Sequence, residues 1–155
     1  MAGKINARLA ELGIVLPPAP APAANYVPFV ISGSLVLVSG QIPLVDGAIQ
    51  GVGKVGRDMD TAGGAEIARI CGLNLIAQAQ AACDGDLDRI ARVVKLGGFV
   101  NCVEDFTEHP EVVNGASNLM VDVFGEIGRH SRFAVGASSL PRGVAVEVEA
   151  IFERS

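Results

Sequence analysis

Two charged residues, Arg132 and Glu147, stand in strongly apolar segments of this chain, where a charge requires an explanation. Arg132 opens the segment 132–137, and Glu147 lies within 144–152. A charge on a strand that enters a core costs free energy unless it is paired or used. A guanidinium holds a carboxylate with two parallel hydrogen bonds, and a carboxylate orients or activates water. We therefore take both residues as the first candidates for catalysis.

Simpler interpretations of the charged residues remain open. Arg132 fits a surface arginine in a weak ion pair. Glu147 and Glu149 are two residues apart and share one face of a strand, which also fits a solvated edge. His109 and His130 flank a predicted helix without the spacing of metal ligands, so the sequence favours helix capping or solvent exposure over catalysis.

Hydrophobic spacing predicts the elements that position these residues. Two long helices are expected over 61–83 and 110–127, after a short helix over 4–12. Apolar runs predict five strands, over 26–31, 34–40, 92–103, 132–137 and 144–152. A Pro-Gly turn joins the last two strands. This order is typical of an α+β fold in which a mixed sheet carries two long helices on one face.

The apolar content predicts that surfaces remain to be covered by another subunit. Hydrophobic residues make up 50% of the 155 residues, and charged residues only 19%. The run Leu35–Val38 is almost continuously apolar, which predicts a strand covered on both faces. With both helices on one face, the other sheet face has no cover from this chain. An apolar face of that kind requires a second copy.

The length fits one domain preceded by an extension. Residues 1–24 hold the predicted N-terminal helix and a connector with four prolines, which excludes regular structure there. Residues 25–155 form the predicted domain.

Charge and composition exclude several classes of partner. The net charge is −5, aromatic residues make up 5%, and Trp is absent, which argues against nucleic acid as the main partner. No run approaches the roughly 20 apolar residues of a membrane span. The three cysteines (Cys71, Cys83 and Cys102) match no zinc or redox spacing and are expected to be buried, reduced thiols. A cytoplasmic location is expected.

Three motifs in this order resemble the RidA/YjgF family of reactive-intermediate deaminases, some of which carry the labels L-PSP endoribonuclease or translation inhibitor. They are Ser39–Pro43, Arg132 placed eight residues before Leu140-Pro141, and Val146–Ala150. The resemblance extends over roughly residues 26–154. It implies a chorismate-mutase-like α+β fold and a homotrimer with ligand clefts between subunits.

The resemblance also assigns roles to residues. Arg132 matches the arginine that grips the carboxylate of a 2-imino or 2-enamino acid, and Glu147 matches the glutamate associated with the hydrolytic water. Tyr26, Ser39 and Asn114 match residues of the substrate cleft. The implied reaction is hydrolytic deamination to a 2-keto acid and ammonia, without metal or organic cofactor. The alternatives are a trimeric protein that binds a small carboxylate metabolite without turnover and, favoured least, an endoribonuclease.

The chain departs from the family pattern around the predicted cleft. Ala134 replaces a cysteine two residues after the arginine, and His130-Ser131 stands where a proline is usual. Gly115–Asn118 replaces bulkier residues, and the N-terminal helix and connector exceed the short family form. These departures predict a reshaped cleft floor and a changed choice of substrate.

Overall fold

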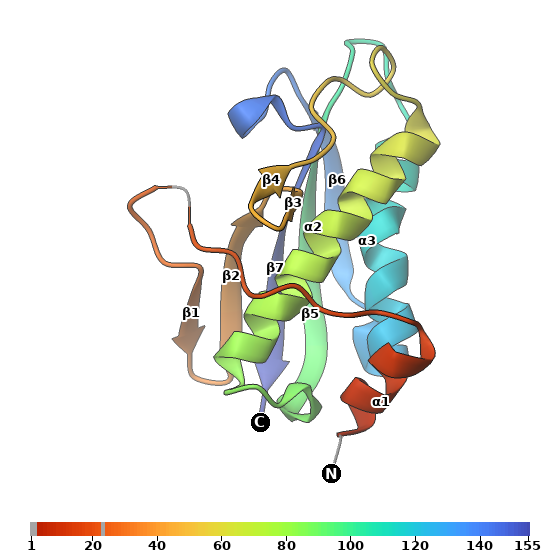
Figure 1. The fold of residues 1–155 in the computed structure, drawn as a ribbon. Coiled ribbons are helices and arrows are strands. Elements are labelled where there is room, and N and C mark those ends of the chain that lie inside the picture. Colours follow the sequence, from red (N-terminus) through yellow and green to blue (C-terminus); the bar gives the residue numbers. More distant parts are fainter. Residues whose placement is uncertain (1–2, 23) are drawn as a thin grey trace.

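The computed structural model describes residues 3–22 and 24–155, so residues 1, 2 and 23 of the predicted N-terminal segment lie outside the description. Within the described residues the chain forms a five-stranded mixed sheet, in the order β1-β2-β7-β5-β6, and a separate two-stranded hairpin, β3-β4 (Figure 1). Two long helices, α2 and α3, pack on one face of the large sheet. The predicted α+β fold is confirmed.

The helices are α1 (Lys4–Glu11), α2 (Thr61–Ala82) and α3 (His109–Phe124), with short 3-10 segments η1 (Leu87–Arg89), η2 (Gly125–Gly128) and η3 (Pro141–Gly143). The strands are β1 (Phe29–Ser32), β2 (Leu35–Gln41), β3 (Leu44–Val45), β4 (Ala48–Ile49), β5 (Ile90–Asn101), β6 (Ser131–Ala137) and β7 (Val146–Arg154). The predicted boundaries differ by three residues at the start of β1 and at the end of α3. There, Gly125 has a φ of 68° and the chain continues to Gly128 as η2.

The predicted strands 132–137 and 144–152 are not neighbours, which corrects the view of them as a joined pair. β5 lies between them: β6 pairs with β5 in parallel, and β7 pairs with β5 and β2 in antiparallel fashion. The Pro-Gly turn therefore connects an edge strand to the centre of the sheet. β7 shows clean two-residue alternation, and the buried members that face the helices are Val146, Val148, Ala150 and Phe152.

The sheet face opposite the helices carries apolar side chains that the described residues leave partly exposed. The prediction that β2 is covered on both faces is wrong for the single chain, because Leu35 and Leu37 are 38% and 41% exposed there. Pairing register places further exposed or half-exposed apolar side chains on this face, namely Ile151, Phe99, Phe133 and Val135. Among the described helices, none combines the length and apolar character that crossing a bilayer requires.

The N-terminal segment is attached to the domain at defined points. Gly3, the residue that precedes α1, offers no side-chain cap. Instead the Asp88 carboxylate of η1 accepts hydrogen bonds from the Lys4 and Ile5 backbone N–H groups, both at 2.8 Å. These bonds hold the pKa of Asp88 below its ordinary value. Ile5 and Leu9 enter the same core as the sheet and the long helices.

Three glycines identified from the sequence allow close packing. A Cβ on Gly98 would lie 2.5 Å from Val113 of α3, and one on Gly97 would lie 2.5 Å from Phe133. These two glycines pair in regular register, so they mark a close approach and not a bulge. Gly115 of α3 contacts the Ala65 backbone of α2 so closely that no side chain fits. Gly115, the first residue of the segment 115–118 that departs from the family pattern, therefore allows α3 to pack closely against α2.

Gly115→Ala should destabilise the fold by about 1–3 kcal/mol, because the added methyl group must separate α2 from α3. The measurement is urea unfolding followed by circular dichroism. The control is Asn118→Ala, at an exposed position of the same helix, where a change within roughly 0.5 kcal/mol is expected. Equal stability of Gly115→Ala and the wild type would contradict the tight helix contact.

Candidate functional site

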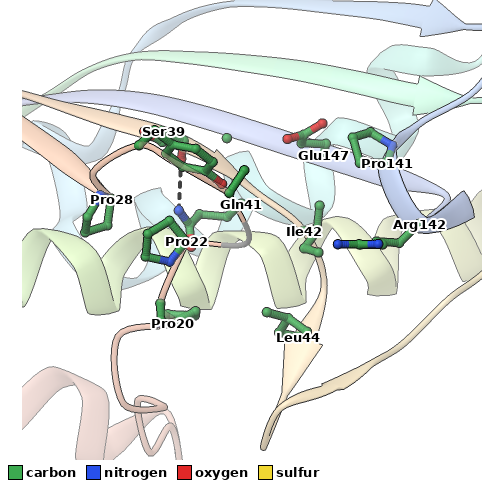
Figure 2. Close-up of a pocket in the computed structure, with 14 residues that line it drawn as sticks. Pro20, Pro22, Pro28, Ser39, Gln41, Ile42, Leu44, Pro141, Arg142 and Glu147 are labelled. Carbon is green, nitrogen blue, oxygen red and sulfur yellow. Dashed lines mark hydrogen bonds between the residues drawn. The ribbon is translucent and has the colours of Figure 1, made fainter.

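A pocket of about 650 Å³ brings together three of the five predicted site residues. Tyr26 precedes β1, Ser39 lies near the end of β2, and Glu147 lies at the start of β7. Figure 2 shows Ser39 and Glu147 along one side, with Arg142 opposite them near Ile42. Apart from these polar groups, the described lining is mainly proline, alanine, isoleucine and leucine. The pocket therefore combines apolar walls with a few polar groups, as small-molecule sites commonly do.

An irregularity in β2 positions Ser39. The pairing of β2 with β7 shifts register between Val38 and Gln41, so the strand bulges where Ser39 enters the pocket. The Ser39 hydroxyl donates to the Val27 carbonyl at 2.8 Å, and its backbone N–H donates to the Pro28 carbonyl at 2.9 Å. The Ser39 oxygen is thus held in place with capacity left to accept a hydrogen bond.

Part of the pocket wall comes from the proline-rich connector. Pro20 and Pro22 line the pocket, and Gln78 of α2 donates from Nε2 to the Pro20 carbonyl at 2.7 Å. One helical turn earlier, Asn74 donates from Nδ2 to the Ile42 carbonyl at 3.1 Å. Two buried amides of one helix therefore hold two walls of the pocket. The proline-rich connector therefore shapes this site.

Glu147 is half-buried at the pocket, and its surroundings raise the pKa of its carboxyl group. Burial is the main cause, and the nearby Glu149 carboxylate adds to it. A Cβ at position 40 would lie 2.6 Å from Glu147 Oε1, so the glycine of the Ser39–Pro43 motif leaves room for the carboxyl group. Glu147 is therefore a carboxyl group whose protonated form is favoured more than in water.

Arg132 and Asn114, the other two predicted site residues, do not line this pocket. Arg132 lies on the edge strand β6, aligned with the buried Leu96, and therefore points to the helix side of the sheet. Its guanidinium donates to Ser117 Oγ at 3.0 Å and to the Pro110 carbonyl at 3.1 Å. Asn114 is exposed on α3, one turn after Pro110.

Within one chain, Arg132 and Glu147 thus lie on opposite faces of the sheet. Glu147 aligns with Phe99 and Val135 on the uncovered face. A small ligand in the Glu147 pocket therefore has no access to Arg132 of the same chain. The sequence alone did not show this separation, because it depends on which strand lies between β6 and β7.

His130 takes part in an ordered contact that the sequence did not indicate. Its Nδ1 lies 2.6 Å from the Gly128 carbonyl and its Nε2 lies 2.8 Å from Ser117 Oγ, the group that accepts from Arg132. Burial is the main cause that lowers the pKa of His130, so the neutral ring is favoured. A neutral ring that donates from Nδ1 lets Ser117 donate to Nε2 while it accepts from Arg132. His130 and Ser117 are positioning residues for the Arg132 guanidinium.

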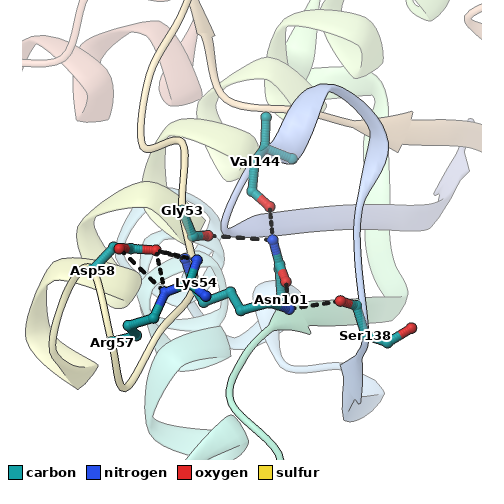
Figure 3. Close-up of polar contacts among 7 residues, drawn as sticks. All are labelled: Gly53, Lys54, Arg57, Asp58, Asn101, Ser138 and Val144. Atoms are coloured by element: carbon teal, nitrogen blue, oxygen red, sulfur yellow. Dashed lines mark hydrogen bonds and ion pairs between the residues drawn. The ribbon is translucent and has the colours of Figure 1, made fainter.

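The glycine loop after β4 is fixed by a polar network. Lys54 Nζ donates to Asn101 Oδ1 at 2.7 Å and to the Ser138 carbonyl at 2.6 Å. Asn101 in turn donates from Nδ2 to the Gly53 and Val144 carbonyls (Figure 3). The segment that leads from η3 into β7 is thereby tied to the loop. Within the described part of the chain, no three His, Cys, Asp or Glu residues group as metal ligands.

Glu147→Gln should stabilise the fold at neutral pH. In the folded protein the pKa of Glu147 lies above its ordinary value of 4.5. Its contribution to the free energy of unfolding is therefore fully present below pH 4.5, where the group is protonated, and is lost as the pH rises through the folded-state pKa. Removing the ionised carboxylate should raise the melting temperature at pH 7 by about 1–3 °C, with no rise near pH 4. Glu66→Gln, at an exposed position of α2, is the control. A lower melting temperature of Glu147→Gln at pH 7 would contradict this account.

Comparison with known proteins places the chain in a family. The model of the family described as YjgF/chorismate mutase-like, putative endoribonuclease, matches residues 6–151. Protein TCP17 of Trypanosoma cruzi is 51% identical over 152 residues, which cover 97% of this chain and 94% of that protein.

Solved structures show the same fold. A protein of unknown function from Agrobacterium tumefaciens is 52% identical, with a TM-score of 0.91 over 97% of this chain and 92% of that one. TdcF of E. coli, solved with bound serine, is 27% identical, with a TM-score of 0.62 over 88% of this chain and 94% of that one. The match over most of the chain agrees with the motifs at Ser39–Pro43 and Val146–Ala150. The chain belongs to the YjgF/chorismate-mutase-like family, the RidA/YjgF family of its sequence resemblance.

Proposed function

We propose that this protein is a cytoplasmic homotrimer that hydrolyses small 2-imino and 2-enamino acids to 2-keto acids and ammonia. The observation that carries the proposal is Glu147, a half-buried carboxyl group with a raised pKa in a pocket that also holds Ser39 and Tyr26. A half-buried carboxyl group with a raised pKa keeps its proton to a higher pH than an exposed one, which suits a residue that must both accept and donate a proton.

The chemistry requires one proton carrier and one water. In the protonated imine, water adds to the carbon of the C=N bond and Glu147 accepts a proton from it. Glu147 then returns this proton to the nitrogen. As the C–N bond breaks and the C=O bond forms, Glu147 accepts the hydroxyl proton and passes it to the departing ammonia, which leaves as ammonium. Atoms and charges balance without a further reactant. Positioning and proton transfer supply the rate enhancement.

The carboxylate of the substrate is assigned to Arg132 of a neighbouring copy. Arg132 and Glu147 point to opposite faces of one sheet, so they serve one ligand only across a subunit boundary. The uncovered apolar face of the sheet, with Leu37 41% exposed and Val135 44% exposed, supports such an assembly. TdcF binds serine, an amino acid with a free carboxylate, which supports a small carboxylate metabolite as the partner.

Arg132→Ala should lower kcat/KM about 100-fold, because two charge-assisted hydrogen bonds to the carboxylate are lost. Glu147→Gln should lower kcat about 10²–10⁴-fold. The measurement is the release of ammonia and 2-keto acid from an imine generated in situ by an amino-acid oxidase.

The matched control is Arg129→Ala, a nearby exposed arginine that pairs with Glu126, and it should retain full activity. Equal rates for Arg132→Ala and the wild type would refute the assignment. Tight binding of the 2-keto acid without release of ammonia would favour a binding protein over an enzyme.

A further inference from the structure

The Glu147 pocket contains a cation that the proposed reaction leaves unused. Arg142, in the η3 turn, is the one Lys or Arg side chain among the described residues that line this pocket. Figure 2 shows its side chain extending from the turn toward Ile42. The structure places its guanidinium at the pocket, near the apolar side chain of Ile42.

Arg142 adopts a backbone conformation that is uncommon for its residue type. Its φ and ψ are 61° and 12°, in the left-handed region that glycine and asparagine adopt most readily. Strained residues of this kind cluster at functional sites, where the surrounding structure holds them. An arginine at this position therefore needs an explanation beyond turn formation.

The turn around Arg142 is held from both sides. The Gly143 N–H donates to the Leu140 carbonyl at 3.0 Å, and the Gly53 N–H donates to the Gly143 carbonyl at 2.9 Å. Val144, which follows, is held by Asn101 in the network of Figure 3. The backbone of Arg142 is therefore fixed, and this limits the positions that its guanidinium can occupy.

The guanidinium of Arg142 is free to bind a ligand. Within residues 3–22 and 24–155 it makes no hydrogen bond and no ion pair, whereas Arg132 makes two hydrogen bonds on α3. Glu147 shares the pocket, but Arg142 is not among the groups that shift its pKa. A guanidinium that is not engaged by protein groups matches a carboxylate of the ligand in its two-pronged geometry.

We propose that Arg142 selects substrates with a second carboxylate, so that this pocket prefers 2-imino dicarboxylic acids. The inference rests on the proposed function: Arg132 of a neighbouring copy holds the carboxylate next to the imine carbon, and Arg142 holds the distal one. Ile42 and the connector prolines contact the carbon chain between them. The pocket wall formed by the connector then also contributes to substrate selection, because it limits the length of the ligand's carbon chain.

The test compares kcat/KM for the imine of a four-carbon dicarboxylic amino acid with that for the imine of a neutral four-carbon amino acid. The wild type should prefer the dicarboxylic imine. Arg142→Gln should reduce this preference at least 10-fold, and Arg142→Lys should reduce it less. Arg142→Gly removes the side chain at a backbone conformation natural to glycine and should match Arg142→Gln. Arg69→Gln, at an exposed position of α2, is the control and should keep the wild-type preference.

Calorimetry with succinate and butyrate separates this inference from the proposed reaction. If no imine is hydrolysed but succinate binds at least 10-fold more tightly than butyrate, and only while Arg142 is present, the inference stands and the deaminase proposal fails. If both imines are hydrolysed with the same preference in the wild type and in Arg142→Gly, the inference is wrong and the deaminase proposal stands. A wild type that prefers the neutral imine would also overturn it.

Discussion

The sheet of this protein has two faces, and its two long helices cover only one of them. Every other feature of the candidate site depends on this constraint. Along β7, alternate residues must enter the core under α2 and α3, which leaves Glu147 and Glu149 on the other face. The site carboxyl group thus lies at the pocket, packed against Gly40 of β2. Its partial burial there, with Glu149 on the same face of the strand, raises its pKa.

The same constraint separates the two charges that first attracted attention. Arg132 is on the helix side, held by Ser117 and Pro110, while Glu147 is on the uncovered side. We propose that a second copy of the chain covers this apolar face and completes the site. In that proposed assembly, one contact buries the apolar face and also brings Arg132 of one copy to the Glu147 pocket of another.

The sequence predicted the fold well because its signals were local. Helical spacing defined α2 and α3, and β-branched runs defined the strands. Strand order was not local, so the insertion of β5 between β6 and β7 was missed, as was the resulting separation of Arg132 from Glu147. Tyr26, Ser39 and Glu147 line one pocket, and their roles in a substrate cleft stay predictions. Sequence reasoning did not single out Arg142, because its left-handed φ and its place at the pocket appear only in three dimensions.

Subunit complementation tests the central claim, a site shared between chains, most directly. Arg132→Ala and Glu147→Gln each remove one half of the site, and the two inactive variants are unfolded, mixed in equal amounts and refolded together. If each site takes Glu147 from one chain and Arg132 from a neighbour, one site in four is intact, and about a quarter of the wild-type activity should return. If both residues act within one chain, mixing restores none, and that result would contradict the account.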